Sequence, residues 1–206
     1  MKVVQPIRDL DLLNRCYEIA RDHDAERADE SAISWELLFA VGCNTALRIS
    51  DLSRLRVDDV RGKEYVNCVA QKTGKDTRIP INKPTQRVIK RLTAGRGAGE
   101  WLFQSRQRDA RTGQPKPVTR QRAWQIIRHV ARAAGVEDRI GCHTLRKTYG
   151  YHHYKTYGDI VKLQRILGHD STRDTLVYIG IIDDEIEDTM RGMSLVYDER
   201  RARHGA

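Results

Sequence analysis

The run from Trp35 to Val41 constrains the fold more than any other feature of this sequence. It is apolar except for one acidic residue and consists of Trp35, Glu36, Leu37, Leu38, Phe39, Ala40 and Val41. A helix built from these residues is hydrophobic on most sides, so other elements must cover it. We therefore expect a helix at the centre of the core, capped at its start by Ser31.

The other segments predict a mainly α fold with one small antiparallel β-sheet, an α+β architecture. Helical spacing of apolar residues recurs over 7–22, 83–93, 119–134, 143–156, 158–167, 171–178 and 183–196. A short helix capped by Ser50 or Asp51 is expected after the central one. The runs 65–70 and 77–81 predict two strands joined by a turn over 73–76. Pro80 limits the second strand to a sheet edge.

The basic composition favours a polyanionic partner. The formal net charge is +9, and 27 Arg outnumber 10 Lys. Each phosphate neutralised by a basic residue releases counterions, and the planar guanidinium matches two phosphate oxygens at once. An Arg-rich composition can also follow from a GC-rich coding sequence, so charge alone leaves nucleic-acid binding at even odds.

The cellular location follows from what the sequence lacks. No apolar stretch is long enough to cross a bilayer, and the first residues have no secretory core. We expect a soluble protein of the cytoplasm, associated with the nucleoid and without a membrane partner. The four scattered cysteines, Cys16, Cys43, Cys68 and Cys142, are expected as free thiols and not as zinc ligands.

Three short segments in the second half of the sequence contain candidate catalytic side chains. On a helix, the spacing of His143 and Arg146 puts both on one face, within reach of one phosphate. Gly168 is a natural helix terminator that would leave His169 at the start of a turn. Tyr178 follows a short helical stretch. Each feature alone occurs often by chance.

Together these segments resemble the tyrosine recombinase (phage integrase) family. The matching phrases are TALRISDL at 45–52, QKTGK at 71–75, HTLRK at 143–147, LQRILGH at 163–169 and TLVY at 175–178. They stand in the family's order with its approximate gaps and cover the chain from about residue 30 to 185. Five ordered motifs are far more specific than any one. The resemblance implies the fold of the family's DNA breaking and rejoining catalytic core.

The resemblance also implies a nucleophile and its supporting charges. Tyr178 matches the nucleophile, which forms a covalent 3′-phosphotyrosine and frees a 5′ hydroxyl, so rejoining needs no ATP. Arg48 and Arg146 match the paired arginines, which stabilise the phosphate's growing negative charge. They can stand where nucleases use metal ions, so we expect no metal and no cofactor.

The remaining implied residues handle protons. Lys72 matches the general acid for the leaving 5′ oxygen, with Lys75 as its local rival. His143 and His169 match the two active-site imidazoles, and which of them acts as base stays open. The implied function is that of a site-specific DNA recombinase or integrase acting on double-stranded DNA.

A second group of basic residues is expected to contact DNA outside the site. Between 104 and 122, glycine and prolines predict a basic loop, and a solvated charged loop is nearly as good an interpretation. Lys147 follows the second arginine and is expected at the DNA backbone or in solvent. The group comprises Arg106, Arg108, Arg111, Lys116, Arg120, Arg122 and Lys147.

The sequence departs from the family in two places. Ala46 stands where the family usually has glycine, and we expect little disturbance from so small a residue. The residues before Arg48 are too few for the separate DNA-binding domain that most members carry there. We expect one catalytic domain over 1–206, with an N-terminal helix and polar segment over 1–29, a core over 30–182 and a C-terminal helix and basic tail over 183–206.

These departures leave the source of DNA affinity open. The chain can be a minimal integrase, an excised catalytic domain, or a protein that relies on an accessory DNA-binding partner. The family's C-terminal helix docks on a neighbouring subunit, so we expect homo-oligomers on DNA through residues 183–198. Two alternative functions remain: a topoisomerase-like enzyme that nicks and reseals, and a non-catalytic DNA-binding or regulatory module.

Overall fold

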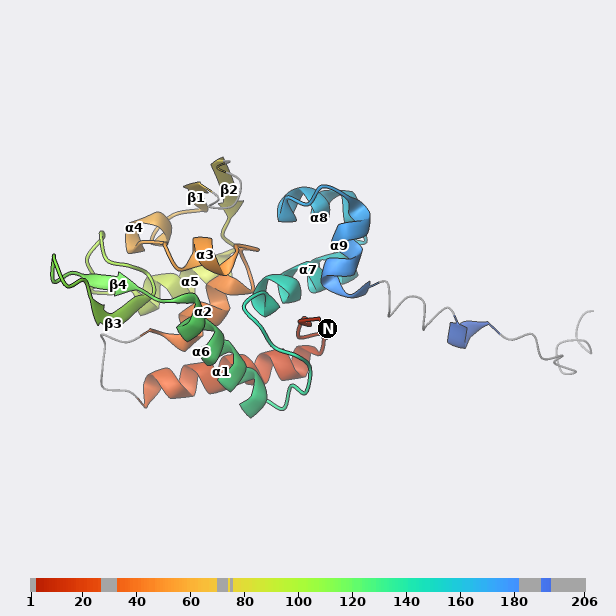
Figure 1. Ribbon diagram of the computed structural model, residues 1–206, viewed down its shortest axis with the longest axis horizontal. Helices are drawn as coiled ribbons and strands as arrows, with labels where there is room; N and C mark the ends of the chain where they lie inside the picture. Colours follow the sequence, from red (N-terminus) through yellow and green to blue (C-terminus); the bar gives the residue numbers. More distant parts are fainter. Residues whose placement is uncertain (1–2, 27–32, 70–73, 75, 182–189, 194–206) are drawn as a thin grey trace, which may run out of the picture.

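A computed structural model describes residues 3–26, 33–69, 74, 76–181 and 190–193 (Figure 1). Two small sheets stand among the helices, which confirms the predicted mainly α architecture. The elements are α1 (Leu10–Ala25), α2 (Trp35–Gly42), α3 (Ile49–Leu52), α4 (Val57–Val60), β1 (Tyr65–Val69), β2 (Asp76–Pro80), α5 (Lys83–Leu92), β3 (Gln104–Arg108), β4 (Pro115–Pro117), α6 (Arg120–Ala133), α7 (Thr144–Tyr157), α8 (Ile160–Leu167) and α9 (Thr172–Ile179).

The central helix α2 is buried along its whole length, as its sequence predicts. It contacts α1, α3, α5 and α7, so helices from both halves of the chain cover it. Its cap is Ser34 and not Ser31, which lies outside the described residues. The Ser34 hydroxyl accepts from the Leu37 N–H and donates to the Asp24 carboxylate, so the cap also joins α2 to the end of α1.

The β1–β2 pair is antiparallel, with Val66 opposite Ile79, which confirms the predicted strands. The prediction of a loop over 104–122 is wrong in part, because β3 and β4 form a second antiparallel pair there. The Val118 N–H donates to the Phe103 carbonyl, and both side chains are buried. These two apolar anchors close the hairpin, while its arginines stay exposed.

The helices α7, α8 and α9 lie together on one side of the molecule (Figure 1). A second apolar cluster joins them and includes Ala46, Leu163, Leu167, Ile179 and Ile181. Gly168 ends α8 with a φ of +59°, the left-handed cap that the sequence predicts. Most of the helix expected over 183–196 and the basic tail lie outside the described residues.

The segment before α1 crosses α7, so the prediction of a helix that begins at residue 7 is wrong there. The Ile7 N–H donates to the Thr148 hydroxyl at 2.9 Å, and Ile7 is buried. Asp9 caps α1, which therefore begins at Leu10. Arg8 donates to the carbonyl of Gly180, where α9 ends, at 3.4 Å. The segment thus connects α7 with the end of α9.

No helix among the described residues is both long and apolar enough to span a membrane.

Candidate active site

Tyr178 lies on α9 with its hydroxyl turned toward the start of α7. The hydroxyl oxygen is 3.3 Å from Nδ1 of His143, which occupies the N-cap position of α7. The ring of His169 meets the Tyr178 ring edge-to-face, with 4.8 Å between centroids. The structure therefore brings both predicted histidines to the predicted nucleophile.

Arg146 is buried, with only 6% of its surface exposed, and the backbone fixes its guanidinium. Nη1 donates to the Ala46 carbonyl, and Nη2 donates to the Leu167 carbonyl at the end of α8. The positive charge of the guanidinium also acts on the Tyr178 phenol and lowers its pKa against the effect of burial. Arg146 thus joins the Ala46 segment and the end of α8 to α7, and it presents a fixed positive charge to the phenol.

Arg48 takes the N-cap position of α3, one residue before the helix start. The prediction that Ser50 or Asp51 caps this helix is therefore wrong. The Arg48 side chain is half-buried and makes no capping hydrogen bond. Its charge acts on Tyr178, His143 and His169, so the four predicted residues share one electrostatic environment with Arg146.

The two imidazoles are held neutral at physiological pH. Burial is the main cause that lowers the pKa of His143 below 6.5, and the charges of Arg120 and Arg146 lower it further. Burial likewise lowers the pKa of His169, followed by the charges of Arg146 and Arg48. A neutral imidazole keeps one ring nitrogen free to accept a proton.

The Tyr178 phenol is protonated in the folded protein. Burial raises its pKa above 10, while the charge and hydrogen bond of Arg146, and the charge of Arg48, pull the pKa back down. The phenol therefore needs a proton acceptor before it can attack, and Nδ1 of His143 is within reach.

A model of the phage integrase family matches residues 12–184. The chain belongs to the phage integrase family. The probable integrase/recombinase YoeC of Bacillus subtilis is 39% identical over 184 residues, which cover 89% of this chain and 93% of that protein. The tyrosine recombinase XerD of Corynebacterium glutamicum is 29% identical over 163 residues, 76% of this chain and 50% of XerD. This confirms the predicted membership of the tyrosine recombinases.

Solved structures of the family confirm the fold of this integrase. The crystal structure of XerA recombinase matches with a TM-score of 0.66 at 20% identity, over 96% of this chain and 67% of that one. The catalytic domain of bacteriophage HP1 integrase matches with a TM-score of 0.60 at 18% identity, over 92% and 95%. The chain spans about half the length of the XerD relatives that it matches.

Lys147 of this tyrosine recombinase is not where the sequence predicts it. Only 5% of its surface is exposed, so it does not face solvent, and its contact with a DNA backbone stays a prediction. Its Nζ lies 4.7 Å from the centroid of the Tyr178 ring. The helical position after Arg146 turns the side chain inward, toward the segment before α1 and α9.

Lys72 and its rival Lys75 both lie outside the described residues. The strands that flank them, β1 and β2, pair as predicted. The assignment of the general acid therefore stays a prediction.

The other basic residues of the integrase lie on its surface, and their role in DNA contact stays a prediction. Lys116 is 3.9 Å from the carboxylate of Asp109, so an ion pair partly offsets its charge. Arg120, at the start of α6, acts electrostatically on His143 and is therefore near the site. The exposed residues are Arg106, Arg108, Arg111, Lys116, Arg120 and Arg122.

Sequence reasoning missed one further contact of the site. The Thr175 hydroxyl lies 3.1 Å from Nδ1 of His169 and donates to the Ser171 carbonyl. Thr175 precedes Tyr178 by one helical turn, so both side chains face the same side of α9. The available signal in the sequence was a threonine one helical turn before the predicted nucleophile. The described residues hold no group of three or more His, Cys, Asp or Glu that could bind a metal ion.

Proposed function

We propose that this integrase is a site-specific DNA recombinase that cleaves and rejoins DNA through a covalent 3′-phosphotyrosine at Tyr178. The observation that carries the proposal is the 3.3 Å approach of the Tyr178 hydroxyl to Nδ1 of His143, beside the fixed guanidinium of Arg146. This grouping of a phenol, a neutral imidazole and a fixed cation supports the roles of nucleophile, base and phosphate-binding charge that we assign to them.

The chemistry follows from these positions. The phenolic oxygen of Tyr178 attacks phosphorus while its proton passes to Nδ1 of His143. Arg48 and Arg146 stabilise the negative charge on the non-bridging oxygens. The bond to the 5′ oxygen breaks, and that oxygen takes a proton from the general acid, which we assign to Lys72. Attack by a 5′ hydroxyl on the phosphotyrosine reverses every step.

The partner in this proposal is double-stranded DNA. One structural relative is XerH bound to a difH substrate, and another is a lambda integrase dimer bound to a core site. This chain's net charge of +9 suits the same kind of partner. We further propose that it forms homo-oligomers on DNA through residues 183–198. The single-domain organisation, an accessory DNA-binding protein and a place at the cytoplasmic nucleoid remain predictions.

The test uses a pool of nicked duplexes of random sequence. A nick beside the cleaved bond lets the short leaving strand diffuse away, which traps the protein on the DNA. We expect a denaturant-resistant adduct with wild type and none with Tyr178→Phe, while Tyr157→Phe, at an exposed tyrosine of α7, behaves as wild type. An adduct that survives Tyr178→Phe would contradict the proposal.

Sequencing the trapped DNA gives the target site. A plasmid that carries this site then distinguishes a recombinase from the two alternative functions. A supercoiled plasmid with two such sites should yield recombinant products. Relaxation without exchange would indicate a topoisomerase-like enzyme, and salt-sensitive binding without any adduct would indicate a non-catalytic module.

A further inference from the structure

Lys147 is a buried cation next to the proposed nucleophile. Its ammonium lies 4.7 Å from the ring centroid of Tyr178, and the residue is 5% exposed. Among the described residues, Lys147 forms no ion pair with a carboxylate. The aromatic face of Tyr178 is therefore its main electrostatic partner on α9.

Stability does not explain a lysine at this position. Removing an ammonium from water is costly, and an apolar side chain of similar length would fill the same space without that penalty. A buried ionisable group whose pKa is shifted by desolvation is a candidate for a functional position. Tyr178 is the site residue that the Lys147 ammonium contacts.

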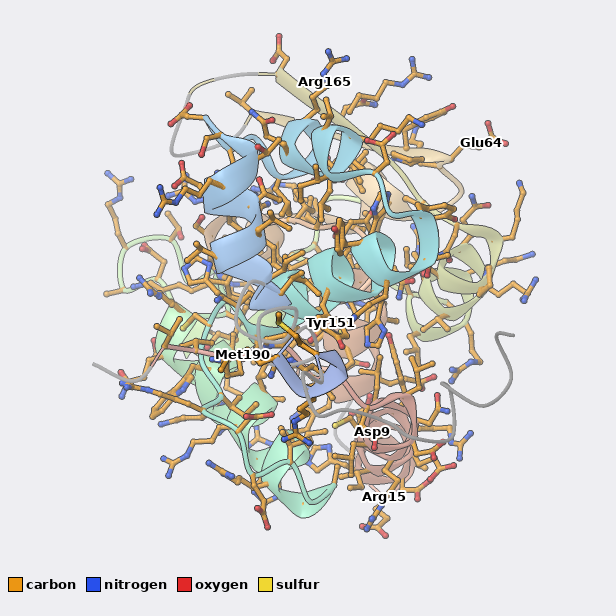
Figure 2. All side chains as sticks on the ribbon, turned by 90° about the vertical axis from the view of Figure 1, so that its right-hand side faces the viewer. Asp9, Arg15, Glu64, Tyr151, Arg165 and Met190 are labelled. Carbon is orange, nitrogen blue, oxygen red and sulfur yellow. The ribbon has the colours of Figure 1, made fainter. Side chains whose placement is uncertain are left out.

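The groups around Lys147 come from three elements. Arg8 approaches from the segment before α1, with its guanidinium 5.6 Å from the ring of Tyr151, which Figure 2 labels on α7. His143 stands one turn earlier on α7, and Tyr178 faces from α9. Burial, and then the charge of Arg8, lower the pKa of Lys147 to about 8.

We propose that Lys147 is a positioning residue for the nucleophile: its ammonium binds the ring face of Tyr178 and holds the hydroxyl toward His143 and Arg146. The proposal rests on the function inferred for Tyr178. The same contact strengthens during attack, because the negative charge that builds as the proton leaves spreads into the ring that faces the ammonium. A contact stronger in the transition state than in the ground state accelerates the reaction.

Lys147 also acts on the base. Its charge is one of those that lower the pKa of His143, which keeps that imidazole ready to accept the phenolic proton. The ring of Tyr178 is thus held between the ammonium on one side and the edge-to-face His169 ring on another. Rotation of the phenol away from His143 would break both contacts.

The experiment compares Lys147→Met and Lys147→Arg with wild type in single-turnover formation of the DNA adduct. At pH 7 we expect Lys147→Met to be slower by about tenfold, the effect of removing a desolvated cation–π interaction. Lys147→Arg should keep most of the rate. The matched control is Lys155→Met, an exposed lysine on the same helix whose Nζ lies 5.8 Å from the Tyr151 ring.

The pH dependence separates positioning from a structural effect. Lys147 loses its charge as the pH rises through about 8, so the ratio of wild-type to Lys147→Met rates should fall toward 1 above about pH 9. The ratio of Lys147→Arg to wild type should rise over the same range. Groups common to all three proteins cancel in these ratios, including the general acid.

A rate ratio that stays constant across this pH range, or a Lys147→Met rate equal to wild type, overturns the proposal. Thermal unfolding identifies a variant that fails to fold, and the Lys147→Arg ratio then decides alone. If wild type itself forms no adduct, the proposed function fails. If wild type reacts and the ratios stay flat, only the role of Lys147 fails.

Discussion

At the residue scale, Ala46 has an unusual backbone conformation at the point where its carbonyl binds Arg146. Its φ of +54° lies in the left-handed region, and its carbonyl accepts a hydrogen bond from the buried guanidinium. The sequence predicts little disturbance from alanine at a position where the family usually has glycine. The left-handed conformation costs about 1–2 kcal/mol, and burial of the methyl group returns about 0.8 kcal/mol, so alanine is tolerated.

We expect Ala46→Gly to change the free energy of unfolding by less than about 1 kcal/mol, because relief of strain and removal of the buried methyl oppose each other. Ala46→Val should lower it by about 2 kcal/mol or more, because a β-branched residue is strained at positive φ and overpacks the cluster with Leu163 and Leu167. Urea unfolding measures both, and equal stability of the two variants would contradict the backbone argument.

A second prediction at this scale concerns acid pH. The pKa of His143 is lowered below 6.5, so the imidazole is neutral above that value and gains a proton only as the pH falls further. The rate of adduct formation should therefore reach half its plateau below pH 6.5. His143→Gln should remove this acid limb along with most of the rate. A half-plateau point above pH 6.5, with DNA binding unchanged, would argue against His143 as the base.

Motif order predicted which residues would meet, but not how their neighbours are oriented. Arg48, Arg146, His143, His169 and Tyr178 share one environment because each falls in a motif that the family spaces in a fixed way. Lys147 ends the HTLRK motif, but its place in the motif does not predict that it is buried. Its burial depends on the segment around Arg8, whose path across α7 no local pattern records.

At the element scale, α7 carries Arg146, has His143 at its N-cap, and packs closely against α2 and α9. A Cβ added at Gly42 of α2 would lie 2.5 Å from Cδ1 of Leu145, and one at Gly150 would lie 2.8 Å from Cγ2 of Ile179. Since Ile179 follows Tyr178 directly, the second contact sets how near α9 approaches α7. We therefore expect Gly150 to set the distance between Tyr178, the proposed nucleophile, and His143, its proposed base.

We expect Gly150→Ala to reduce adduct formation about tenfold or more while the protein stays folded. Alanine favours the helix by about 1 kcal/mol, which offsets part of the packing strain, but the added methyl pushes α9 away from His143. Single-turnover kinetics and thermal unfolding measure the two effects. Lys155→Ala, at an exposed position of the same helix, is the control, and wild-type kinetics for Gly150→Ala would refute this spacing role.

Periodicity predicted the helices better than the sheets. The predicted range 119–134 agrees with α6 (Arg120–Ala133), and 171–178 agrees with α9, because both have clear caps and apolar faces. The β3–β4 hairpin escaped prediction because its strands are mostly basic and polar, with prolines at both ends of β4. Its pairing depends on Phe103 and Val118, which flank the strands and gave no alternating pattern.

At the scale of the whole molecule, charge and chemistry occupy different places. The buried cations Arg146 and Lys147 lie beside Tyr178, whereas Arg106, Arg108 and Arg111 stand exposed on the β3–β4 hairpin and the turn between its strands. Phosphate contacts made by such residues give affinity without sequence preference. The whole molecule should therefore bind duplex DNA in a strongly salt-dependent way.

We expect the logarithm of the binding constant to fall linearly with the logarithm of salt concentration. Combining Arg106→Ala with Arg108→Ala should reduce the slope by about 0.9 for each phosphate that these arginines neutralise. Fluorescence anisotropy at several salt concentrations measures the slope. Arg21→Ala, at an exposed arginine of α1, serves as the control. An unchanged slope in the hairpin variant would place the DNA elsewhere.

The hydrogen bond between Arg8 and Gly180 joins groups 172 residues apart, and the one between Arg146 and Ala46 spans 100 residues. A nascent chain on the ribosome cannot close the first of these until α9 has left the exit tunnel. A fragment from a premature stop before Thr172 carries both arginines and both histidines of the site, but not Tyr178. The proposed nucleophile is therefore the last of the described site residues to be synthesised, and an interrupted chain that ends before α9 lacks it.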